Sequence, residues 1–256
     1  MSQTRSLVTG AGSGIGKATA LLLAERGSRV ALLGRTEGEL RTTANKIESI
    51  GGSHLLLVAD ISIADQVRDA FVRVSREWEG LDVLVANAGI NGVWAPIEHL
   101  EPEEWDATMN INLRGTFLTV KYAVPLMKHG GGSIVITSSE VGTRLFNRAG
   151  STAYGCTKAA QVAFMKQQAL ELAQFGIRVN AVCPGWIRTE VEHNMSTRKL
   201  DEIQRWIDYP MGVIPLTRGM LPDARAVAKL IAFLASDEAD HITGTEVYID
   251  GAESLL

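Results

Sequence analysis

Several features that define whole classes of protein are missing from this chain. Its 256 residues include only 2 cysteines, too few for a disulfide framework, and no Cys/His cluster has the spacing of a metal site. We therefore expect no metal, and we expect Cys156 and Cys183 to be buried, reduced side chains. No run approaches the ~20 apolar residues of a membrane span, and no apolar leader opens the chain. These absences predict a cytoplasmic protein with no membrane partner.

An excess of positive charge is also missing. The chain carries 25 Lys and Arg against 29 Asp and Glu, a formal net charge of −4. Nucleic-acid binding needs a basic face, so we expect no nucleic-acid partner. The composition is 46% hydrophobic and 21% charged, which is typical of a globular core rather than of disorder. No polar linker divides the chain, so we expect one domain over residues 1–256.

Two kinds of apolar segment alternate along the chain. Short runs that are apolar throughout are typical of parallel strands buried on both faces, and the segments between them have helical periodicity. The expected strands are Leu7–Thr9, Arg29–Leu33, His54–Val58, Val83–Ala86, Ser133–Thr137, Arg178–Val182 and Glu246–Ile249. The expected helices are Ile15–Arg26, Glu37–Ile50, Ile63–Trp78, Pro102–Met127, Ala153–Phe175 and Asp223–Ala235. This alternation predicts an α/β fold, a single doubly wound Rossmann-type domain with a mainly parallel seven-stranded sheet and helices on both faces.

Residues 186–222 interrupt the alternation, and we expect them to form a lid over a substrate pocket. The best helix candidate within this segment is Arg198–Ile207. Apolar side chains that would face the pocket are Trp94, Trp186, Met195, Trp206, Ile207, Tyr209 and Met211. Binding pockets are usually apolar, so this composition predicts a largely apolar small-molecule substrate.

A glycine-rich turn, Thr9-Gly10-Ala11-Gly12-Ser13-Gly14-Ile15-Gly16, follows the first expected strand. Glycines here allow a tight turn and a close approach to a pyrophosphate at the helix N-terminus. The spacing of these glycines differs from the GxGxxG motif, which would require glycine in place of Ile15. It also differs from the phosphate-binding loop of nucleoside triphosphatases. Taken alone, the turn is equally compatible with an ordinary strand-to-helix connection.

The end of the second expected strand bears on the choice of dinucleotide. Enzymes that prefer NAD usually place an acid there, about 20 residues after the glycine turn. This chain has Gly34, Arg35 and Thr36 instead. A guanidinium suits the 2′-phosphate of NADP, which favours NADP over NAD. The alternative is that Arg35 is simply a solvated side chain.

Tyr154 and Lys158 have the i, i+4 spacing that places two side chains on one face of a helix. A phenol with a pKa of ~10 exchanges protons poorly at neutral pH. An ammonium group about 5 Å away is expected to lower the pKa of this phenol by roughly two units. The pair is therefore a candidate acid/base.

These motifs occur in an order that resembles one family. The TGxxxGxG turn is followed by Asn87-Ala88-Gly89, Asn112, Ser139, the YxxxK pair and Pro184-Gly185. Together they are similar to the ~250-residue branch of the short-chain dehydrogenase/reductase family, over about Leu7 to Gly251. The resemblance implies an NAD(P)(H)-dependent oxidoreductase that interconverts a secondary alcohol and a ketone by hydride transfer.

The resemblance also implies a role for each matching residue. Tyr154 would exchange the proton with the substrate oxygen, Ser139 would hold that oxygen, and Lys158 would bind the nicotinamide ribose. Asn112 would hold a water that links Lys158 to solvent. The implied cofactor contacts are Gly10, Ser13, Gly14, Ile15, Gly16, Arg35, Asp60, Ile61, Asn87, Ala88, Gly89, Tyr154, Lys158, Pro184, Gly185, Ile187 and Thr189. A homotetramer built on the helices near Pro102–Met127 and Ala153–Phe175 is implied as well.

Alternatives remain open at several positions. Ser138 competes with Ser139, Asn110 with Asn112, and Asp60 has a second reading as a helix cap. Glu140 is unusual directly after the serine, and it would either contact substrate or pair with Arg144 or Arg148. A non-catalytic dinucleotide sensor or scaffold on the same fold is the alternative function, and a nucleotide-dependent phosphotransferase is a more remote one.

Overall fold

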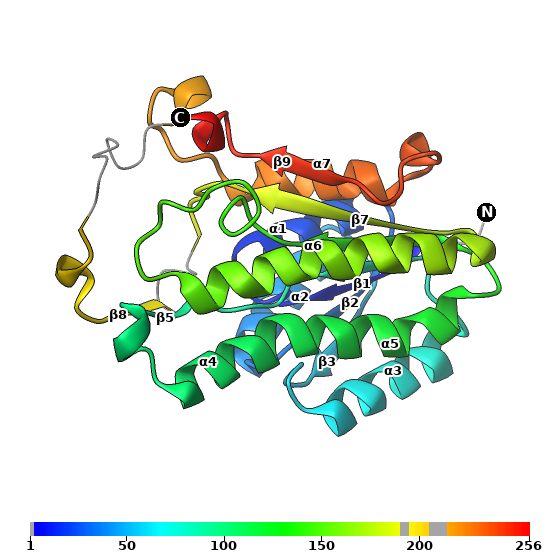
Figure 1. Cartoon of the computed structure of the whole chain (residues 1–256). Coiled ribbons are helices and arrows are strands. Elements are labelled where there is room, and N and C mark those ends of the chain that lie inside the picture. The colour runs from blue at the N-terminus through cyan, green and yellow to red at the C-terminus, as the bar shows by residue number, and fades with distance from the viewer. Residues whose placement is uncertain (1–2, 190–194, 205–213) are drawn as a thin grey trace.

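The computed structural model describes residues 3–189, 195–204 and 214–256. A seven-stranded sheet crosses it (Figure 1). Its strands are β1 (Arg5–Thr9), β2 (Arg29–Gly34), β3 (His54–Val58), β4 (Val83–Ala86), β6 (Gly132–Thr137), β7 (Ile177–Pro184) and β9 (Glu246–Ile249). Their order is β3-β2-β1-β4-β6-β7-β9, and every neighbouring pair is parallel. The predicted fold class is confirmed, and each expected strand lies within an observed one.

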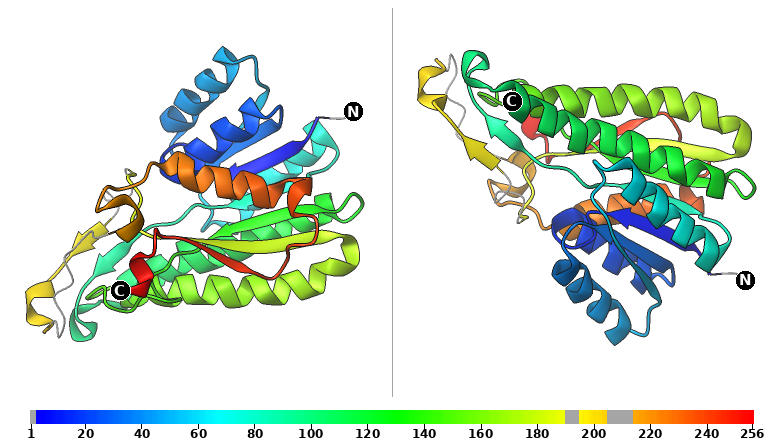
Figure 2. Two further views of the ribbon diagram at one scale, coloured as in Figure 1. Left: turned by 90° about the horizontal axis from the view of Figure 1, so that it is seen from above. Right: turned by 90° about the horizontal axis from the view of Figure 1, so that it is seen from below.

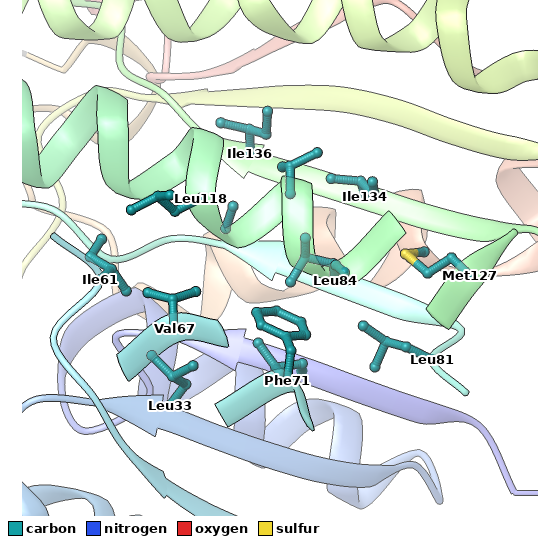
Figure 3. Close-up of a cluster of buried hydrophobic side chains, with 14 of the residues drawn as sticks. Leu33, Ile61, Val67, Phe71, Leu81, Leu84, Leu118, Met127, Ile134 and Ile136 are labelled. Atoms are coloured by element: carbon teal, nitrogen blue, oxygen red, sulfur yellow. The ribbon is translucent and has the colours of Figure 1, made fainter. Parts of the chain in front are cut away.

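Successive residues of the central strands point to opposite faces of the sheet. Leu7 and Leu84, which are partners in the β1–β4 register, belong to one buried cluster. Their neighbours Val8 and Val85 belong to the other. Figure 3 shows the first cluster, where Phe71 packs close to Leu84. Because both faces are covered, the strands are apolar throughout.

Helices cover both faces of the sheet (Figures 1 and 2). The face that carries Val8 is covered by α1 (Gly14–Glu25), α2 (Glu37–Ser49) and α7 (Ala224–Ala235). The other is covered by α3 (Ala64–Trp78), α5 (Gly115–Met127) and α6 (Thr152–Leu172). Shorter elements are α4 (Pro102–Met109) and the 3-10 turns η1 (Ile97–His99), η3 (Ala173–Phe175), η6 (Pro215–Thr217), η7 (Asp237–Ala239) and η8 (Glu253–Leu255). No helix within the described ranges is long and apolar enough to cross a membrane.

The helix expected over Pro102–Met127 is interrupted. A π-helical turn, η2 (Asn110–Arg114), separates α4 from α5. Such turns are frequent at functional sites, and this one carries the buried side chain of Asn112. Hydrophobic periodicity does not register a single wide turn, so the sequence gives no sign of the interruption.

The expected lid differs from the prediction where the structure describes it. Residues Met195–Thr197 form a strand, β8, which pairs in parallel with β5 (Gly92–Trp94). A 3-10 turn, η5 (Leu200–Glu202), takes the place of the expected helix Arg198–Ile207 up to residue 204. Three-residue elements are too short to leave a periodic signal. Trp206, Ile207, Tyr209 and Met211 lie outside the described residues.

The cysteines show one correct and one wrong expectation. Cys183 is buried in β7, whereas Cys156 is exposed on α6. Tyr154 and Lys158 lie on the face of α6 that packs against the sheet, and residue 156, two positions after Tyr154, lies on the opposite face of the helix.

The topology determines where a ligand site forms. From β1 the chain adds β2 and β3 on one side of the sheet and then β4 and the later strands on the other, so the direction of strand order reverses at β1. Doubly wound folds bind ligands at the carboxyl ends of the strands beside such a reversal. The β5–β8 pair and η8 project at the same end of the molecule (Figure 2). The sheet therefore forms the floor of the candidate site, and these segments form its walls.

Leu84 tests the contribution of this double-sided core. Its side chain is 0% exposed in the central strand β4, so we expect Leu84→Ala to lower the free energy of unfolding by about 2–5 kcal/mol. Urea denaturation followed by circular dichroism measures the change. Val58→Ala, at a position 53% exposed, is the matched control and is expected to have a much smaller effect. Equal losses in the two variants would contradict the assignment of the core.

Candidate active site

A cavity of about 1340 Å³ opens at the carboxyl ends of the strands. It brings most of the predicted site residues together. Those that line it are Gly10, Ser13, Gly14, Ile15, Arg35, Asp60, Ile61, Asn87, Ala88, Gly89, Ser139, Tyr154, Lys158, Pro184, Gly185, Ile187 and Thr189. Gly16 and Asn112 lie behind the lining and support it.

The glycine-rich turn has the backbone conformation that its sequence predicts. Gly10 and Gly14 have φ of +67° and +51°, which other residues rarely adopt. A Cβ on Gly16 would lie 2.1 Å from the Gly10 carbonyl oxygen, so the turn closes on itself only with glycine there. The start of α1 lines the cavity and has no side-chain cap, so its first N–H groups are available to a pyrophosphate.

Hydrogen bonds fix the loop after β4 to the end of β1. The Thr9 hydroxyl accepts from the backbone N–H of Asn87 at 2.9 Å and of Ala88 at 3.0 Å. The Asn87 amide donates to the Thr9 carbonyl at 3.1 Å. Asn87 thus has a structural role in addition to its place in the cavity wall.

At the far end of the cavity, Asp60 accepts hydrogen bonds from the Ser62 N–H and hydroxyl at 2.8 and 2.7 Å. The residue at the N-cap of α3 is Ile63, so the reading of Asp60 as the cap of that helix is wrong. Glu39 was missed by sequence reasoning, although it lines the cavity close to Gly12. Its only sequence signal is an acid in the first turn of the helix after Arg35.

Tyr154 and Lys158 share the inner face of α6. The Lys158 Nζ lies 5.5 Å from the centre of the Tyr154 ring and donates a hydrogen bond to the Thr137 carbonyl at 2.9 Å. The Ser139 hydroxyl is within hydrogen-bonding reach of Tyr154. The Ser138 hydroxyl instead donates to the Lys158 backbone carbonyl at 2.8 Å. Ser139, rather than Ser138, therefore accompanies the phenol.

The acidities of this pair differ from the expectation. Burial raises the pKa of Tyr154, against the opposing effect of its hydrogen bond with Ser139. Burial also lowers the pKa of Lys158 to about 8. The expected downward shift of the Tyr154 pKa is therefore wrong, because removal of the phenol from water acts in the opposite direction.

Asn112 reaches the site through the π-helical turn. Its Oδ1 accepts from the Ile90 N–H at 2.8 Å, and its Nδ2 donates to the Ile90 carbonyl at 2.9 Å. A Cβ on Gly89 would lie 3.0 Å from Asn112 Oδ1 and 3.9 Å from Lys158 Nζ. Asn112 is fully buried, whereas Asn110 is exposed. The position next to Lys158 is thus occupied by Asn112.

The outer part of the cavity is mainly apolar. Trp94 lies beside Tyr154, with ring centres 6.4 Å apart. Other apolar side chains in this wall are Leu145, Trp186, Met195, Leu200 and Ile203. This is the side on which the sequence predicts an apolar substrate.

Neither of the two expected pairings of Glu140 with arginine forms. Arg148 forms an ion pair with Glu253, and Arg144 stacks on the Tyr248 ring with its guanidinium carbon 3.6 Å from the ring centre. Burial, together with the negative charges of Glu253 and Asp250, raises the pKa of Glu140 to about 8. Sequence reasoning missed Glu253, because only the return of β9 beside β7 brings it to the site.

Comparison with known proteins identifies the family. A family profile described as "Enoyl-(Acyl carrier protein) reductase" matches residues 10–252. The 3-oxoacyl-[acyl-carrier-protein] reductase of Thermotoga maritima is 39% identical over 246 residues, which cover 96% of this chain and 95% of that protein.

Solved structures agree with this result. A 3-ketoacyl-ACP reductase from Sinorhizobium meliloti superposes with a TM-score of 0.93 at 50% identity, covering 98% of this chain and 99% of that one. A 3-ketoacyl-(acyl-carrier-protein) reductase from Brucella melitensis, solved with NADH, superposes with a TM-score of 0.86 at 30% identity, covering 98% of each chain. The chain belongs to the short-chain dehydrogenase/reductase family of NAD(P)-dependent oxidoreductases.

Proposed function

We propose that Tyr154 is the acid/base of a reaction that interconverts a secondary alcohol and a ketone. One observation carries the proposal: a half-buried phenol and a buried lysine on α6 meet a hydroxyl from the loop after β6 at the wall of the large cavity. A bound nicotinamide dinucleotide would supply or accept the hydride. The residues supply orientation and the proton.

Each side chain has a part that its surroundings support. The raised pKa of Tyr154 keeps its proton in place at neutral pH, ready for donation to a carbonyl oxygen during reduction. Ser139 holds that oxygen by a hydrogen bond. Lys158 would bind the nicotinamide ribose, and Asn112 would position the proton relay beside it. All four groups are present, which disfavours the alternative of a non-catalytic sensor.

The remaining contacts follow the length of the cavity. Gly10, Ser13, Gly14, Ile15 and Gly16 would form the pyrophosphate cradle. Asp60 and Ile61 would hold the adenine, Asn87, Ala88 and Gly89 the ribose, and Pro184, Gly185, Ile187 and Thr189 the carboxamide. The closed glycine turn, which a Cβ on Gly16 would block, supports this fit.

We infer a preference for NADP over NAD. The support is Arg35, an exposed guanidinium at the cavity end where β2 stops. Its fork suits a 2′-phosphate. Glu39 opposes this preference, because its carboxylate lies in the same part of the lining. The balance between these two side chains determines the choice.

The expected substrate is a largely apolar ketone or the matching alcohol. The apolar wall formed by Trp94, Leu145 and Trp186 supports this class. Relatives named as 3-oxoacyl-carrier-protein reductases make 3-oxoacyl thioesters the first compounds to test. A panel should also include cyclic ketones and long-chain secondary alcohols.

We also infer a homotetramer in the cytoplasm. Two large apolar side chains, Phe117 on α5 and Leu170 on α6, are 43% and 81% exposed in the single chain. A second copy that packs on these helices would bury them. The exposed thiol of Cys156 suits a reducing compartment.

Tyr154→Phe tests the acid/base. Loss of the hydroxyl is expected to lower kcat by about 10²–10⁴-fold while the cofactor still binds, because only the proton donor is removed. Ketone reduction is followed through NAD(P)H absorbance, and cofactor binding through NAD(P)H fluorescence. Tyr122→Phe, on α5 outside the cavity lining, is the matched control. Turnover retained in Tyr154→Phe would refute the mechanism.

Arg35→Ser tests the cofactor preference. Removal of a charge-assisted contact worth about 1.5–3 kcal/mol is expected to weaken NADPH binding by roughly 10–100-fold and to leave NADH binding nearly unchanged. Dissociation constants from fluorescence titration give the result. Glu39→Gln is the companion variant and is expected to strengthen NADPH binding. Equal losses for both cofactors in Arg35→Ser would contradict recognition of the 2′-phosphate.

Light scattering tests the assembly. The measured mass of the wild-type protein is expected to be four times the chain mass of 27.6 kDa. Leu170→Glu places charge at the proposed contact and is expected to yield smaller species. Leu216→Glu, which changes a side chain 80% exposed in η6, controls for added charge. A monomeric wild type would exclude the tetramer.

A further inference from the structure

Glu140 occupies a fixed position directly after Ser139. Its side chain is 2% exposed. Its backbone N–H donates to the Pro184 carbonyl at 3.1 Å, and its own carbonyl accepts from Arg144 and Leu145, each at 2.9 Å. The main chain at Glu140 is therefore fixed, and its buried side chain is enclosed by its surroundings.

Those surroundings are acidic. The Glu140 carboxyl is within hydrogen-bonding reach of the Glu253 carboxyl in η8, and Asp250 adds a second negative charge. Glu253 is itself 7% exposed. Its Oε1 accepts from Arg148 and its Oε2 from the Trp186 N–H at 3.2 Å. Asp250 is occupied by the N–H groups of Ala252 and Ser254.

No cation is left to neutralise Glu140 among the described neighbours. Arg148 is engaged by Glu253, and Arg144 is stacked on Tyr248. From α6 the facing group is Tyr154, a neutral phenol, and Lys158 is directed to the Thr137 carbonyl. If the carboxyls of Glu140 and Glu253 are both ionised, the buried Oε2 of Glu140 has no hydrogen-bond partner in the part of the chain that the structure describes.

One proton resolves this arrangement. Two adjacent buried carboxylates with a single guanidinium carry an uncompensated charge, which is costly in a poorly solvated site. A proton on Glu140 removes that charge and turns the unpartnered oxygen into a donor toward Glu253. Burial and the neighbouring acids, which raise the pKa of Glu140 to about 8, act in the same direction.

We propose that Glu140 is a positioning residue that stays protonated at neutral pH and donates a hydrogen bond to Glu253, joining the loop after Ser139 to the C-terminal turn. Gly185 makes this junction possible. A Cβ there would lie 2.9 Å from Asp250 Cα and 3.1 Å from Glu140 Oε2. Three segments thus meet at one wall of the cavity, beside Tyr154.

Loss of this proton has two consequences. The Glu140 carboxylate repels Glu253, which loosens the contact between the loop and η8. The new negative charge also raises the pKa of Tyr154 further, which disfavours the phenolate needed for alcohol oxidation. The effect on turnover rests on the proposed function, but the protonation state of Glu140 does not.

Infrared difference spectroscopy tests the protonation directly. The spectrum of the full-length wild type minus that of Glu140→Gln at pH 7 is expected to show the carbonyl band of a protonated carboxylic acid. This band is expected to disappear on titration with a midpoint near the Glu140 pKa of about 8. In a Glu253→Gln background the midpoint is expected to fall, because one negative neighbour is removed. Glu238→Gln, an exposed acid in η7, is expected to show only carboxylate bands. Carboxylate bands alone for Glu140 at pH 7 would overturn the proposal.

Urea denaturation from pH 5 to pH 9 provides a second measurement that needs no substrate. When the pKa of a carboxyl is higher in the folded state than in the unfolded state, the protein becomes less stable as the pH rises from the unfolded-state pKa to the folded-state pKa. The urea midpoint of Glu140→Gln relative to wild type is therefore expected to rise through this window and then level off above about pH 8. A difference that does not vary with pH would contradict a protonated Glu140.

The pH profile of alcohol oxidation tests the positioning role. With an alcohol identified in the panel, titration of Lys158 near pH 8 is common to all three proteins, so the comparison is the shift between their kcat/KM profiles. The wild-type profile is expected to differ from that of Glu140→Gln around pH 8, and the profile of Glu253→Gln is expected to be displaced toward lower pH, because only the titration of Glu140 changes. Superimposable pH profiles in all three proteins would refute the positioning role while leaving the infrared result intact. Absence of turnover in every protein would instead count against the proposed function.

Discussion

The geometry of the site depends on one buried amide. Asn112 closes two hydrogen bonds with the backbone of Ile90 and a third with Thr157, so it joins the π-helical turn, the loop after β4 and α6. A buried amide that lost these partners would cost more than the bonds contribute when formed. Tyr154 precedes Thr157 on α6 and Lys158 follows it, so this amide helps to hold both side chains in the cavity wall.

The wide helical turn explains how that amide reaches its partners. A regular helix through residues 102–127 would rotate Asn112 away from the loop after β4, and η2 restores the orientation at the expense of regular hydrogen bonding. Gln161 compensates in part, since its amide donates to the Asn112 carbonyl at 2.9 Å. Local irregularity and the polar network therefore depend on each other.

The fold and the motif residues were predictable for a physical reason. Strands buried on both faces leave continuous apolar runs, and a position such as Gly16, where a Cβ would collide with Gly10, permits only one residue type. Contacts between residues that lie far apart in the sequence leave no such pattern. Glu253 meets Glu140 only because β9 lies beside β7, and the acidity of Tyr154 depends on burial, which spacing along a helix does not reveal.

The short β5–β8 pairing connects the outer wall of the cavity to the neighbourhood of Tyr154. Strand β5 ends at Trp94, whose carbonyl accepts from the Arg198 N–H at 2.9 Å and whose ring lies beside Tyr154. A bulky ligand that displaces β8 outward must either break the three-residue pairing of β5 with β8 or displace Trp94 as well. The width of a ligand therefore bears on the position of Trp94, the side chain that lies beside Tyr154.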